Sequence, residues 1–327
     1  MANYNLDSVT VAEDKSSIAV QYEKCEIDRE PYLEKARQVA SLTIPFLYPP
    51  KGANEATDYP TPYQSVGSRG VTNLASKLML ALFPPQAPFF RLDIDELVYK
   101  QIEGDPQQKA TIEQGLAKIE KAVMDSIESN NDRVAVYECL KHLIVSGNCL
   151  LKLSEDGIRT YTLSHYIVKR DPQGKILKII IKEGVSPNTL PPELLKGMEG
   201  KLSEEDKSLD LYTSITREKG RYYLCQEISK KKVFEKYYDL DKLPFIALRF
   251  NRIDGMNYGR GHCETFEGDL RSLEGLTKAI LEGSSASSKM LFLIAPNGST
   301  RASSVAKAPN GAIIEGNASD VSVLQTN

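Results

Sequence analysis

The chain has no tryptophan, and its 327 residues include only three histidines and five cysteines. The cysteines are Cys25, Cys139, Cys149, Cys225 and Cys263. Because they are odd in number and widely spaced, the sequence predicts free thiols in a reducing cytoplasm rather than a disulfide framework. Cys139, His142 and Cys149 come closest to a metal-binding set, but a structural zinc site normally takes four ligands in paired spacings. We therefore interpret Cys139 and His142 as partly buried helix residues and predict no metal site.

Long apolar runs and catalytic motifs are also missing from the sequence. No run approaches the ~18 residues that span a bilayer, and the N-terminal stretch carries Asp7 and no apolar segment of a secretory signal. No G-x-x-x-x-G-K-[ST] phosphate loop occurs. His262 and Cys263 suggest an activated thiol at a helix start, yet no third group orients them, so a polar first turn is the better interpretation. The sequence therefore predicts a protein that is no enzyme, needs no cofactor and enters no membrane.

The charge balance argues against tight binding of nucleic acid. The formal net charge is −3, with 26% charged and 41% hydrophobic residues, as in a soluble globular chain. Proteins that grip DNA do so mainly by neutralising phosphates, and they are basic for that reason. If this chain handles DNA, it does not hold it tightly.

Helical and strand-like patterns occupy separate blocks, so the predicted fold class is α+β. Residues 1–27 are polar and aperiodic, which predicts a loosely held arm. The expected helices cover residues 30–47, 65–83, 110–129, 133–146, 190–198 and 259–289. The expected strands cover residues 149–153, 159–163, 167–170, 176–182, 210–216, 221–228, 232–237, 245–251, 291–295 and 312–315. Residues 130–132 are expected to cap the helix that follows them, and Gly147 to end it.

The expected helix over residues 259–289 carries three stripes of side chains. The first stripe is charged and contains Glu264, Glu267, Arg271, Glu274, Lys278 and Glu282. The second is apolar and contains Phe266, Leu270, Leu273, Leu276 and Ile280. The third is small and contains Gly268, Ser272, Gly275, Ala279, Gly283 and Ala286.

A surface helix needs only two faces, one for the core and one for water. Each interior glycine costs roughly 1 kcal/mol relative to alanine, so the small stripe needs a compensating contact. Close approach of another backbone would supply that contact. The alternative is a long helix of a monomeric enzyme that happens to carry small residues, and the pattern alone does not decide between the two.

Four stretches of the sequence carry a family resemblance. They are residues 58–84 (DYPTPYQSVGSRGVTNLASKLMLALFP), 145–148 (VSGN), 168–171 (VKRD) and 258–274, which contains YGR and GDLRSLE. In these motifs and in their order between about residues 22 and 324, the chain resembles the portal, or head-to-tail connector, proteins of short-tailed, podovirus-type bacteriophages.

The resemblance implies a structural ring of twelve subunits at one capsid vertex, assembled in the host cytoplasm and retained in the virion. Its channel would pass double-stranded DNA during packaging and ejection, without sequence specificity. The family order of wing, stem and clip corresponds here to residues 28–258, 259–289 and 290–327. In the family a returning stem helix, more wing and a crown follow, and we expect this chain to lack them. The implied partners are further copies of the chain, terminase, tail adaptor, capsid and scaffolding proteins.

The resemblance also assigns roles to residues. A closed ring needs two different contact faces on each subunit, and the apolar and small stripes can supply them. This expected interface contains Phe266, Gly268, Leu270, Ser272, Leu273, Gly275, Leu276, Ala279, Ile280 and Gly283. The charged stripe is expected to face the channel or a partner. In the clip, the exposed turns are expected to dock the packaging motor and then the tail through Asn297, Arg301, Lys307 and Asn310.

Two alternatives stay open. The chain could form a tail adaptor ring below the portal, or act as a nuclease or NTPase of the packaging machinery. An enzyme of either kind would need clustered carboxylates for two metals or a phosphate loop, and neither is visible.

Overall fold

Helices and antiparallel strands occupy separate blocks of the chain, which confirms the predicted α+β class. The computed structural model describes residues 16–54, 56–84, 88–94, 106–187, 208–287, 291–308, 313 and 315–324. The chain forms two units, Met1–Gly268 and Asp269–Asn327. Among the residues just given, no helix is both long and apolar enough to cross a bilayer.

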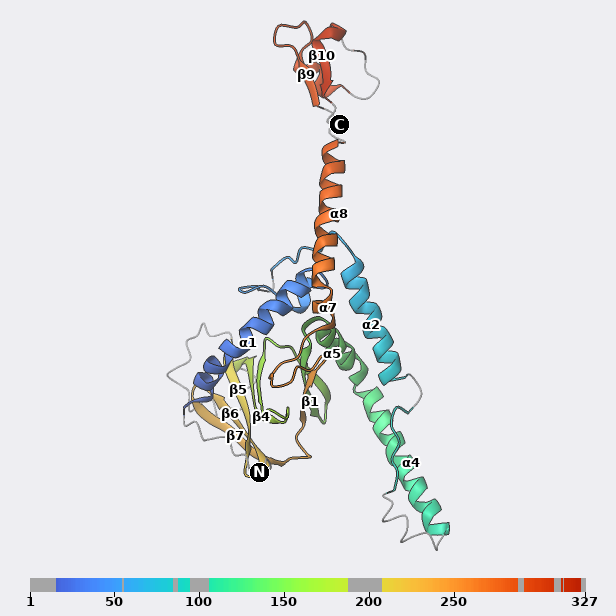
Figure 1. Ribbon diagram of the computed structural model, residues 1–327, viewed down its shortest axis with the longest axis vertical. Coiled ribbons are helices and arrows are strands. Elements are labelled where there is room, and N and C mark those ends of the chain that lie inside the picture. The colour runs from blue at the N-terminus through green and yellow to red at the C-terminus, as the bar shows by residue number, and fades with distance from the viewer. Residues whose placement is uncertain are drawn as a thin grey trace. The chain divides into compact units, whose positions relative to one another are not determined.

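The first unit contains two antiparallel sheets (Figure 1). In spatial order, the larger sheet consists of β3 (Tyr166–Arg170), β4 (Ile176–Val185), β5 (Leu209–Glu218), β6 (Arg221–Ile228) and β7 (Lys231–Asp239). The smaller sheet consists of β2 (Gly157–Tyr161), β1 (Asn148–Ser154) and β8 (Phe245–Arg249). The strands expected between residues 149 and 251 are therefore present, with ends that differ by a few residues.

Two hairpin turns set the register of the larger sheet. The β5–β6 turn has φ angles of 44° at Lys219 and 78° at Gly220, and the β6–β7 turn has 48° at Ser229 and 66° at Lys230. Positive φ at both central residues is the geometry of a type I′ turn, whose twist matches that of the flanking strands. The chain order of these strands is thus also their order in space.

The first unit also contains several larger helices. They are α1 (Ile18–Ser41), α2 (Val66–Leu82), α4 (Pro106–Ser129) and α5 (Asp132–Ser146). In α5, nine of the 15 residues are buried, because α1, α2 and the strands β1 and β2 all contact it. This helix is the centre of the unit (Figure 1).

The first helix begins earlier than predicted. The loosely held arm was expected through residue 27, but α1 starts at Ile18 and buries Ile18, Tyr22 and Cys25 against the larger sheet. The prediction was wrong because these contacts, spaced i, i+4 and i+7, are few and lie among polar residues. The helix then runs through Pro31 on its exposed side, where water can bond the Ile27 carbonyl that the proline leaves without a donor.

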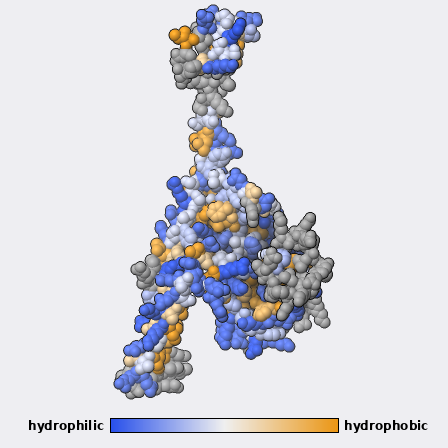
Figure 2. Space-filling model, turned by 180° about the vertical axis from the view of Figure 1, so that it is seen from behind, coloured by the Kyte–Doolittle hydropathy of each residue, from blue (hydrophilic) through white to orange (hydrophobic). Residues whose placement is uncertain are grey.

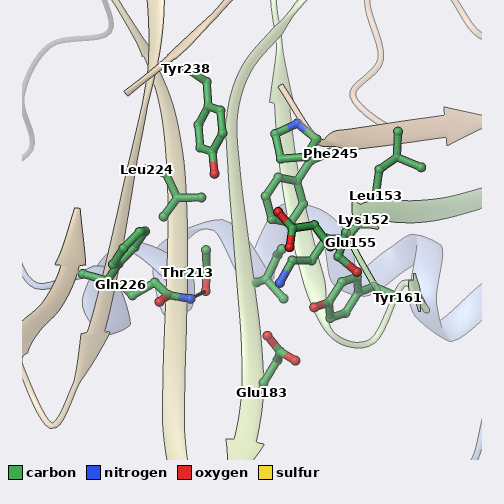
Figure 3. A pocket seen from close by; sticks show the side chains of 14 residues that line it. Lys152, Leu153, Glu155, Tyr161, Glu183, Thr213, Leu224, Gln226, Tyr238 and Phe245 are labelled. Carbon is green, nitrogen blue, oxygen red and sulfur yellow. Dashed lines mark hydrogen bonds between the residues drawn. The ribbon is translucent and has the colours of Figure 1, made fainter. Parts of the chain in front are cut away.

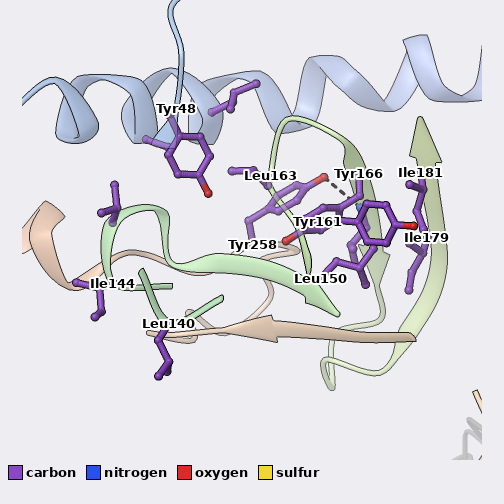
Figure 4. Close-up of a cluster of buried hydrophobic side chains, with 14 of the residues drawn as sticks. Tyr48, Leu140, Ile144, Leu150, Tyr161, Leu163, Tyr166, Ile179, Ile181 and Tyr258 are labelled. Atoms are coloured by element: carbon purple, nitrogen blue, oxygen red, sulfur yellow. Dashed lines mark hydrogen bonds between the residues drawn. The ribbon is translucent and has the colours of Figure 1, made fainter. Parts of the chain in front are cut away.

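The main core lies between α1, α5 and the strands (Figure 4). Leu150, Leu163 and Ile179 have no exposed surface there. Tyr48 is also buried, and its hydroxyl donates to Ser146 Oγ at 2.7 Å. Buried polar atoms are costly without partners, so this bond fixes the end of α5 against the segment after α1.

The start of α5 is not capped as predicted. Asn131 has a left-handed conformation with φ 56° and makes no side-chain cap, so the expected capping by residues 130–132 was wrong. Asp132 Oδ1 instead accepts a hydrogen bond from Ile158 N at 2.7 Å and ties the helix to β2. At the other end Gly147 ends the helix with φ 76°, which confirms its predicted role.

The helix expected over residues 259–289 is interrupted. Its first piece is α7 (His262–Thr265), and α8 (Glu267–Ser287) follows after a break at Phe266, whose φ and ψ are −107° and 12°. The rest of the second unit contains β9 (Leu291–Ile294), α9 (Ala302–Lys307) and β10 (Val321–Leu324). Of the strand expected at 312–315, the structure describes residues 313 and 315, and neither lies in a strand; β9 pairs with β10.

Several predictions fall outside the described residues. They are the helix at 190–198, the residues of the N-terminal arm before 16, Lys289 at the end of the expected stem, and Asn310 in the clip.

Candidate functional site

The backbone that leads into α7 is held by the turn between α5 and β1. Asn148 is 1% exposed, and its side-chain amide bonds Gly259 in both directions. Its Oδ1 accepts from Gly259 N at 2.7 Å, and its Nδ2 donates to Gly259 O at 2.9 Å. One side chain thus bonds a distant backbone as a neighbouring strand would. Because both groups are buried, removing the amide would leave Gly259 without partners.

Glycines make this close approach possible. A methyl group built on Gly147 would lie 2.2 Å from the carbonyl carbon of Arg260. One built on Gly261 would lie 2.3 Å from the carbonyl oxygen of Val145. Backbone atoms cannot move aside as the tip of a flexible side chain can. No side chain therefore fits at either position in this arrangement.

A third segment joins the same place from β3. Val168 N donates to the Tyr258 hydroxyl at 3.2 Å, and Arg170 N donates to Asn257 Oδ1 at 2.8 Å. Burial raises the pKa of Tyr258, so the hydroxyl stays protonated. Residues 145–148, 168–171 and 257–261 therefore converge, and we call this cluster the stem foot. It joins three of the four stretches that carry the family resemblance.

Two acidic residues of the charged stripe are held in ion pairs beside the stem foot. Glu267 pairs with Lys35 at 2.5 Å, and Glu264 pairs with Arg260. Their side chains are 11% and 18% exposed. Both were expected to face the channel or a partner. Because their carboxylates are engaged within the first unit, they have little surface left for that role.

The remaining predicted stem residues lie on α8, where the apolar stripe changes character along the helix. Leu270 is 9% exposed and Leu273 is half-buried, whereas Leu276 and Ile280 are 63% and 68% exposed. Phe266, at the break before α8, is 46% exposed. Figure 2 shows hydrophobic side chains on the surface of this helix.

The small stripe of α8 faces open space. Methyl groups built on Gly268, Gly275 and Gly283 would meet no atom of the described chain within 4 Å. Ser272 and Ala279 are exposed as well. The close backbone contact predicted for this stripe is therefore not made within the part of the chain that the structure describes.

The rest of the charged stripe is solvated. Arg271, Lys278 and Glu282 are exposed, and Glu274 is half-buried. Lys278 Nζ lies 3.9 Å from Glu282 Oε1, a spacing of i, i+4. Exposed pairs of this kind contribute at most about 0.5 kcal/mol, so the stripe is a polar surface rather than a structural clamp.

The described residues of the expected clip are organised around one carboxylate. Asp320 Oδ2 accepts from Ser299 Oγ at 3.1 Å, and from Thr300 N and Oγ1 at 3.3 Å. Desolvation raises the pKa of Asp320, but the hydrogen bonds from Ser299 and Thr300 together outweigh it and lower this pKa. Gly298 lets this carboxylate approach closely, because a methyl group built on it would lie 2.7 Å from Asp320 Oδ2. The Asp320 carboxylate thus joins the loop after β9 to the start of β10.

The two basic residues predicted for docking lie in one groove of the clip. Arg301 lies in the loop just before α9, as expected from the sequence, whereas Lys307 is the last residue of that helix rather than part of a loop. Together with Ile313 and Glu315 they line a groove of about 1050 Å³. Ile313 is fully exposed, and Asn297 is exposed in the turn after β9.

Burial determines the chemistry of the five cysteines and of His142. All five cysteines are free and buried. Burial lowers the pKa of His142 to about 4, and it raises the pKa of Cys149. The pKa of Cys263 is raised to about 11, again by burial. This shift is opposite to that of an activated thiol and agrees with the interpretation of residues 262 and 263 as an ordinary helix start.

No sequence pattern predicted the cavity of about 570 Å³ that lies between the two sheets (Figure 3). Leu224 and Phe245 form part of its apolar wall, and Lys152, Tyr161 and Glu183 point toward it. Burial and the Glu183 carboxylate raise the pKa of Tyr161 to about 12. The lining residues come from distant strands, so no local motif could have revealed them.

The sequence did not predict the stem foot as a site, although the segments that form it carry the family resemblance. Asn148 and Gly259 are 111 residues apart, and no periodicity links them. The stem foot could have been suspected from Gly147, Gly259 and Gly261, because glycine permits two backbone segments to approach closely.

Comparison with known proteins identifies relatives over most of the chain. A family model described as bacteriophage head to tail connecting protein matches residues 15–327. The portal protein of Enterobacteria phage T3 is 41% identical over 315 residues, which cover 93% of this chain and 59% of that protein. The portal protein of Escherichia phage T7 is 40% identical over 316 residues, with the same coverage of 93% and 59%.

A more distant relative is the portal protein of Enterobacteria phage SP6, which is 32% identical over 318 residues and is covered to 61% of its length. The chain therefore spans about three fifths of the length of these curated relatives.

Proposed function

Because the chain belongs to the bacteriophage head to tail connecting protein family, we propose that it is the wing, stem and clip of a portal subunit. Such subunits form a ring at one capsid vertex, and twelve copies are expected. The channel of the ring passes double-stranded DNA during packaging and ejection. The relatives named as portal proteins in phages T3 and T7 support this proposal most directly.

The observation that carries the ring is the exposed face of α8. Leu276, Ile280 and Leu281 are each more than half exposed, and methyl groups built on Gly275 and Gly283 would meet no described atom within 4 Å. Contiguous exposed apolar side chains mark interaction sites in soluble proteins. In a closed ring, each subunit contacts its two neighbours through two different surfaces. The apolar stripe and the small stripe of α8 can supply these two surfaces.

The first unit offers two further apolar faces of this kind. On α4, the exposed side chains are Ile112, Ile119 and Val123, and Figure 2 shows hydrophobic side chains along this helix. On α2, they are Val66, Leu80 and Leu82. These two faces lie on different helices, so each could meet its complement on a neighbouring subunit to either side.

The chain has 44 acidic and 41 basic residues, giving a net charge of −3. A surface of mixed charge favours passage of DNA over adhesion, because tight binding depends on neutralising many phosphates at once. The exposed part of the charged stripe, from Arg271 to Glu282, is the surface proposed to face the channel or a partner.

The clip is proposed to dock the packaging motor first and the tail later. Its groove brings Arg301 and Lys307 together with the exposed Ile313, and this combination suits an acidic partner with an apolar contact. Reversing both charges, with Arg301→Glu and Lys307→Glu, should leave ring formation intact and weaken motor or tail binding in a pull-down. Unchanged affinity and salt dependence for both partners would show that these charges take no part.

The rival functions make different predictions. A tail adaptor would also form a ring but would occupy another level of the virion. A nuclease or NTPase would hydrolyse DNA or ATP as a pure protein, in a reaction that depends on a metal and on one residue of this chain. We propose that it does neither, and that ATP hydrolysis resides in a separate motor protein.

Electron microscopy of the full-length purified protein is the decisive experiment. The proposal expects closed rings with a central channel, and antibody labelling at a single vertex of the capsid above the tail. Monomers at all concentrations would overturn it. Labelling below the portal position would instead identify the adaptor.

A further inference from the structure

Positive charge gathers around the turn between β3 and β4, outside the sites described above. Arg170 ends β3, Arg249 ends β8, and Arg252 follows shortly after β8. All three approach Gly174 of that turn. A methyl group built on Gly174 would lie 3.0 Å from Arg249 Nη2 and 3.4 Å from Arg252 Cζ, and Gly174 O accepts from Arg170 Nη1 at 3.0 Å. The guanidinium groups therefore lie side by side over one glycine, and we call them the arginine cluster.

Backbone carbonyl oxygens hold the arginines in place. Arg170 donates to Asn257 O at 3.1 Å and to Ala247 O at 2.9 Å. Arg249 Nη1 donates to Met256 O at 2.8 Å, and Arg252 Nη2 donates to Gln173 O at 3.2 Å. Neutral carbonyls fix the orientation of these groups, but they do not cancel their charge.

Among the described residues, Arg252 takes part in an ion pair, whereas Arg170 and Arg249 take part in none. Asp254 Oδ1 lies 3.3 Å from Arg252 Nη2, but the aspartate side chain is 91% exposed and the contact is solvated. Asp171 is buried, and its Oδ1 accepts from Lys175 N at 2.7 Å within the turn. The arginine cluster is thus left with excess positive charge.

Burial, and after it the charge of a neighbouring arginine, lowers the pKa of two of these arginines. Burial and the charge of Arg249 lower the pKa of Arg170 to about 10. Burial and the charge of Arg252 lower the pKa of Arg249 as well. An oxyanion placed on Arg249 and Arg252 would relieve the repulsion between their charges, and their planar donors match a carboxylate with two parallel hydrogen bonds.

We propose that Arg249 and Arg252 receive a carboxylate side chain from a second copy of this chain. The proposal rests on the ring proposed above, and it names one polar contact within it. A nucleic-acid surface would instead need basic groups spread along the path of the phosphates, whereas these arginines form one compact point. The chain has more acidic than basic residues, so a second copy can supply the complementary charge.

Cross-linking can identify the carboxylate directly. The full-length protein carrying Arg252→Lys and Asp254→Asn offers a primary amine at position 252 and removes the neighbouring carboxylate. A carbodiimide then joins that amine only to a carboxylate in contact with it. In rings assembled from a mixture of normal and ¹⁵N-labelled protein, we expect cross-linked peptides that combine the two labels.

A matched control is available in the same unit. Arg221 is exposed and lies 3.3 Å from Asp239 of its own chain. Arg221→Lys should therefore give cross-links within one chain only. If position 252 gives only such cross-links, or none, while the rings are intact, the proposal is wrong.

Charge reversal tests whether the contact matters for assembly. Arg252 is 54% exposed, so Arg252→Glu should fold normally, as its thermal unfolding would show. We expect the fraction of protein in rings to fall about tenfold or more, because like charges then meet. Arg252→Lys should retain assembly, and Arg221→Glu should assemble as the wild type does.

The outcomes separate this inference from the proposed function. Wild-type protein that forms no rings would overturn the function itself. Wild-type rings together with normal rings of the Arg252→Glu variant would overturn only the inference. Normal rings that bind random-sequence duplex DNA more weakly, with a smaller salt dependence, would assign the arginine cluster to DNA and also overturn it.

Discussion

The helices α5 and α8 show how the same residue types can serve opposite purposes in one chain. In α5, Leu140 and Ile144 are 6% and 1% exposed, because the helix is covered by other elements of its own unit. In α8, Leu276 and Ile280 are 63% and 68% exposed. The buried side chains of α5 stabilise the subunit, whereas Leu276 and Ile280 of α8 remain largely uncovered in the described chain. We infer that the first helix is a folding element and the second an assembly element.

Replacing one leucine by alanine in each helix should give the largest difference in the free energy of unfolding. Leu140→Ala removes buried methyl groups and leaves a cavity in the core, so the free energy of unfolding should fall by roughly 2–5 kcal/mol. Leu276→Ala removes an exposed side chain and should change it by no more than about 0.5 kcal/mol. Denaturant unfolding of the dissociated protein measures both. Equal losses would show that α8 is already packed within the subunit.

Acid should weaken α5 through His142. Burial lowers the pKa of this histidine to about 4, whereas in the unfolded chain it is about 6.5. Between those values the unfolded state binds more protons, so stability is complete above about pH 6.5 and falls as the pH drops toward 4. The loss is on the order of 3 kcal/mol.

Comparison with His142→Gln isolates this effect. Both proteins are unfolded by denaturant at several pH values from 7 to 4, and the difference between their unfolding free energies is plotted. The difference should narrow as the pH falls, because only the wild type carries the depressed pKa. Parallel pH profiles would mean that His142 is solvated in the native protein.

Alanine at two glycines should have effects of opposite sign. At Gly261 the new methyl group would lie 2.3 Å from Val145 O, so Gly261→Ala should lower the free energy of unfolding by about 1–3 kcal/mol. At Gly275 the space is open, and Gly275→Ala should raise helix stability by up to about 1 kcal/mol. Thermal unfolding of the dissociated chains measures the stability of both variants. If both substitutions destabilise the chain, the space around Gly275 on α8 is not open.

Local patterns were sufficient for much of the fold. The strand block follows from period-two alternation and from glycines such as Gly157 and Gly174, which supply the positive φ of the turns. The helices α2 and α4 follow from their apolar periodicity. The beginning of α1 did not follow from the sequence pattern, because its buried residues are sparse. The helix α9 did not follow from it either, because six residues are too few to show a period.

Contacts between distant segments could not be predicted in this way. The bonds of Asn148 to Gly259 and the meeting of Arg170 with Arg249 depend on how the sheets are placed, and no local rule encodes that placement. The role of α8 also depends on contacts that no local sequence pattern specifies. Its stripes predicted a close backbone contact, and the described chain shows only that the surface for it is open.

The most direct test of α8 is a substitution that should leave the subunit almost unchanged. Gly275→Leu adds a large side chain to the small stripe, where the described chain has room for it. Because leucine favours helix more than glycine, the free energy of unfolding of the dissociated chain should stay within about 1 kcal/mol of the wild type. If the stripe is a close contact in the ring, however, the added volume cannot be absorbed and assembly should fail. Lys278→Leu places the same side chain on the charged stripe of this helix, and its failure to assemble as well would show that the effect is not specific to the small stripe. Electron microscopy and sedimentation of the two variants measure the outcome, and full rings of Gly275→Leu would show that α8 meets its neighbours through another face.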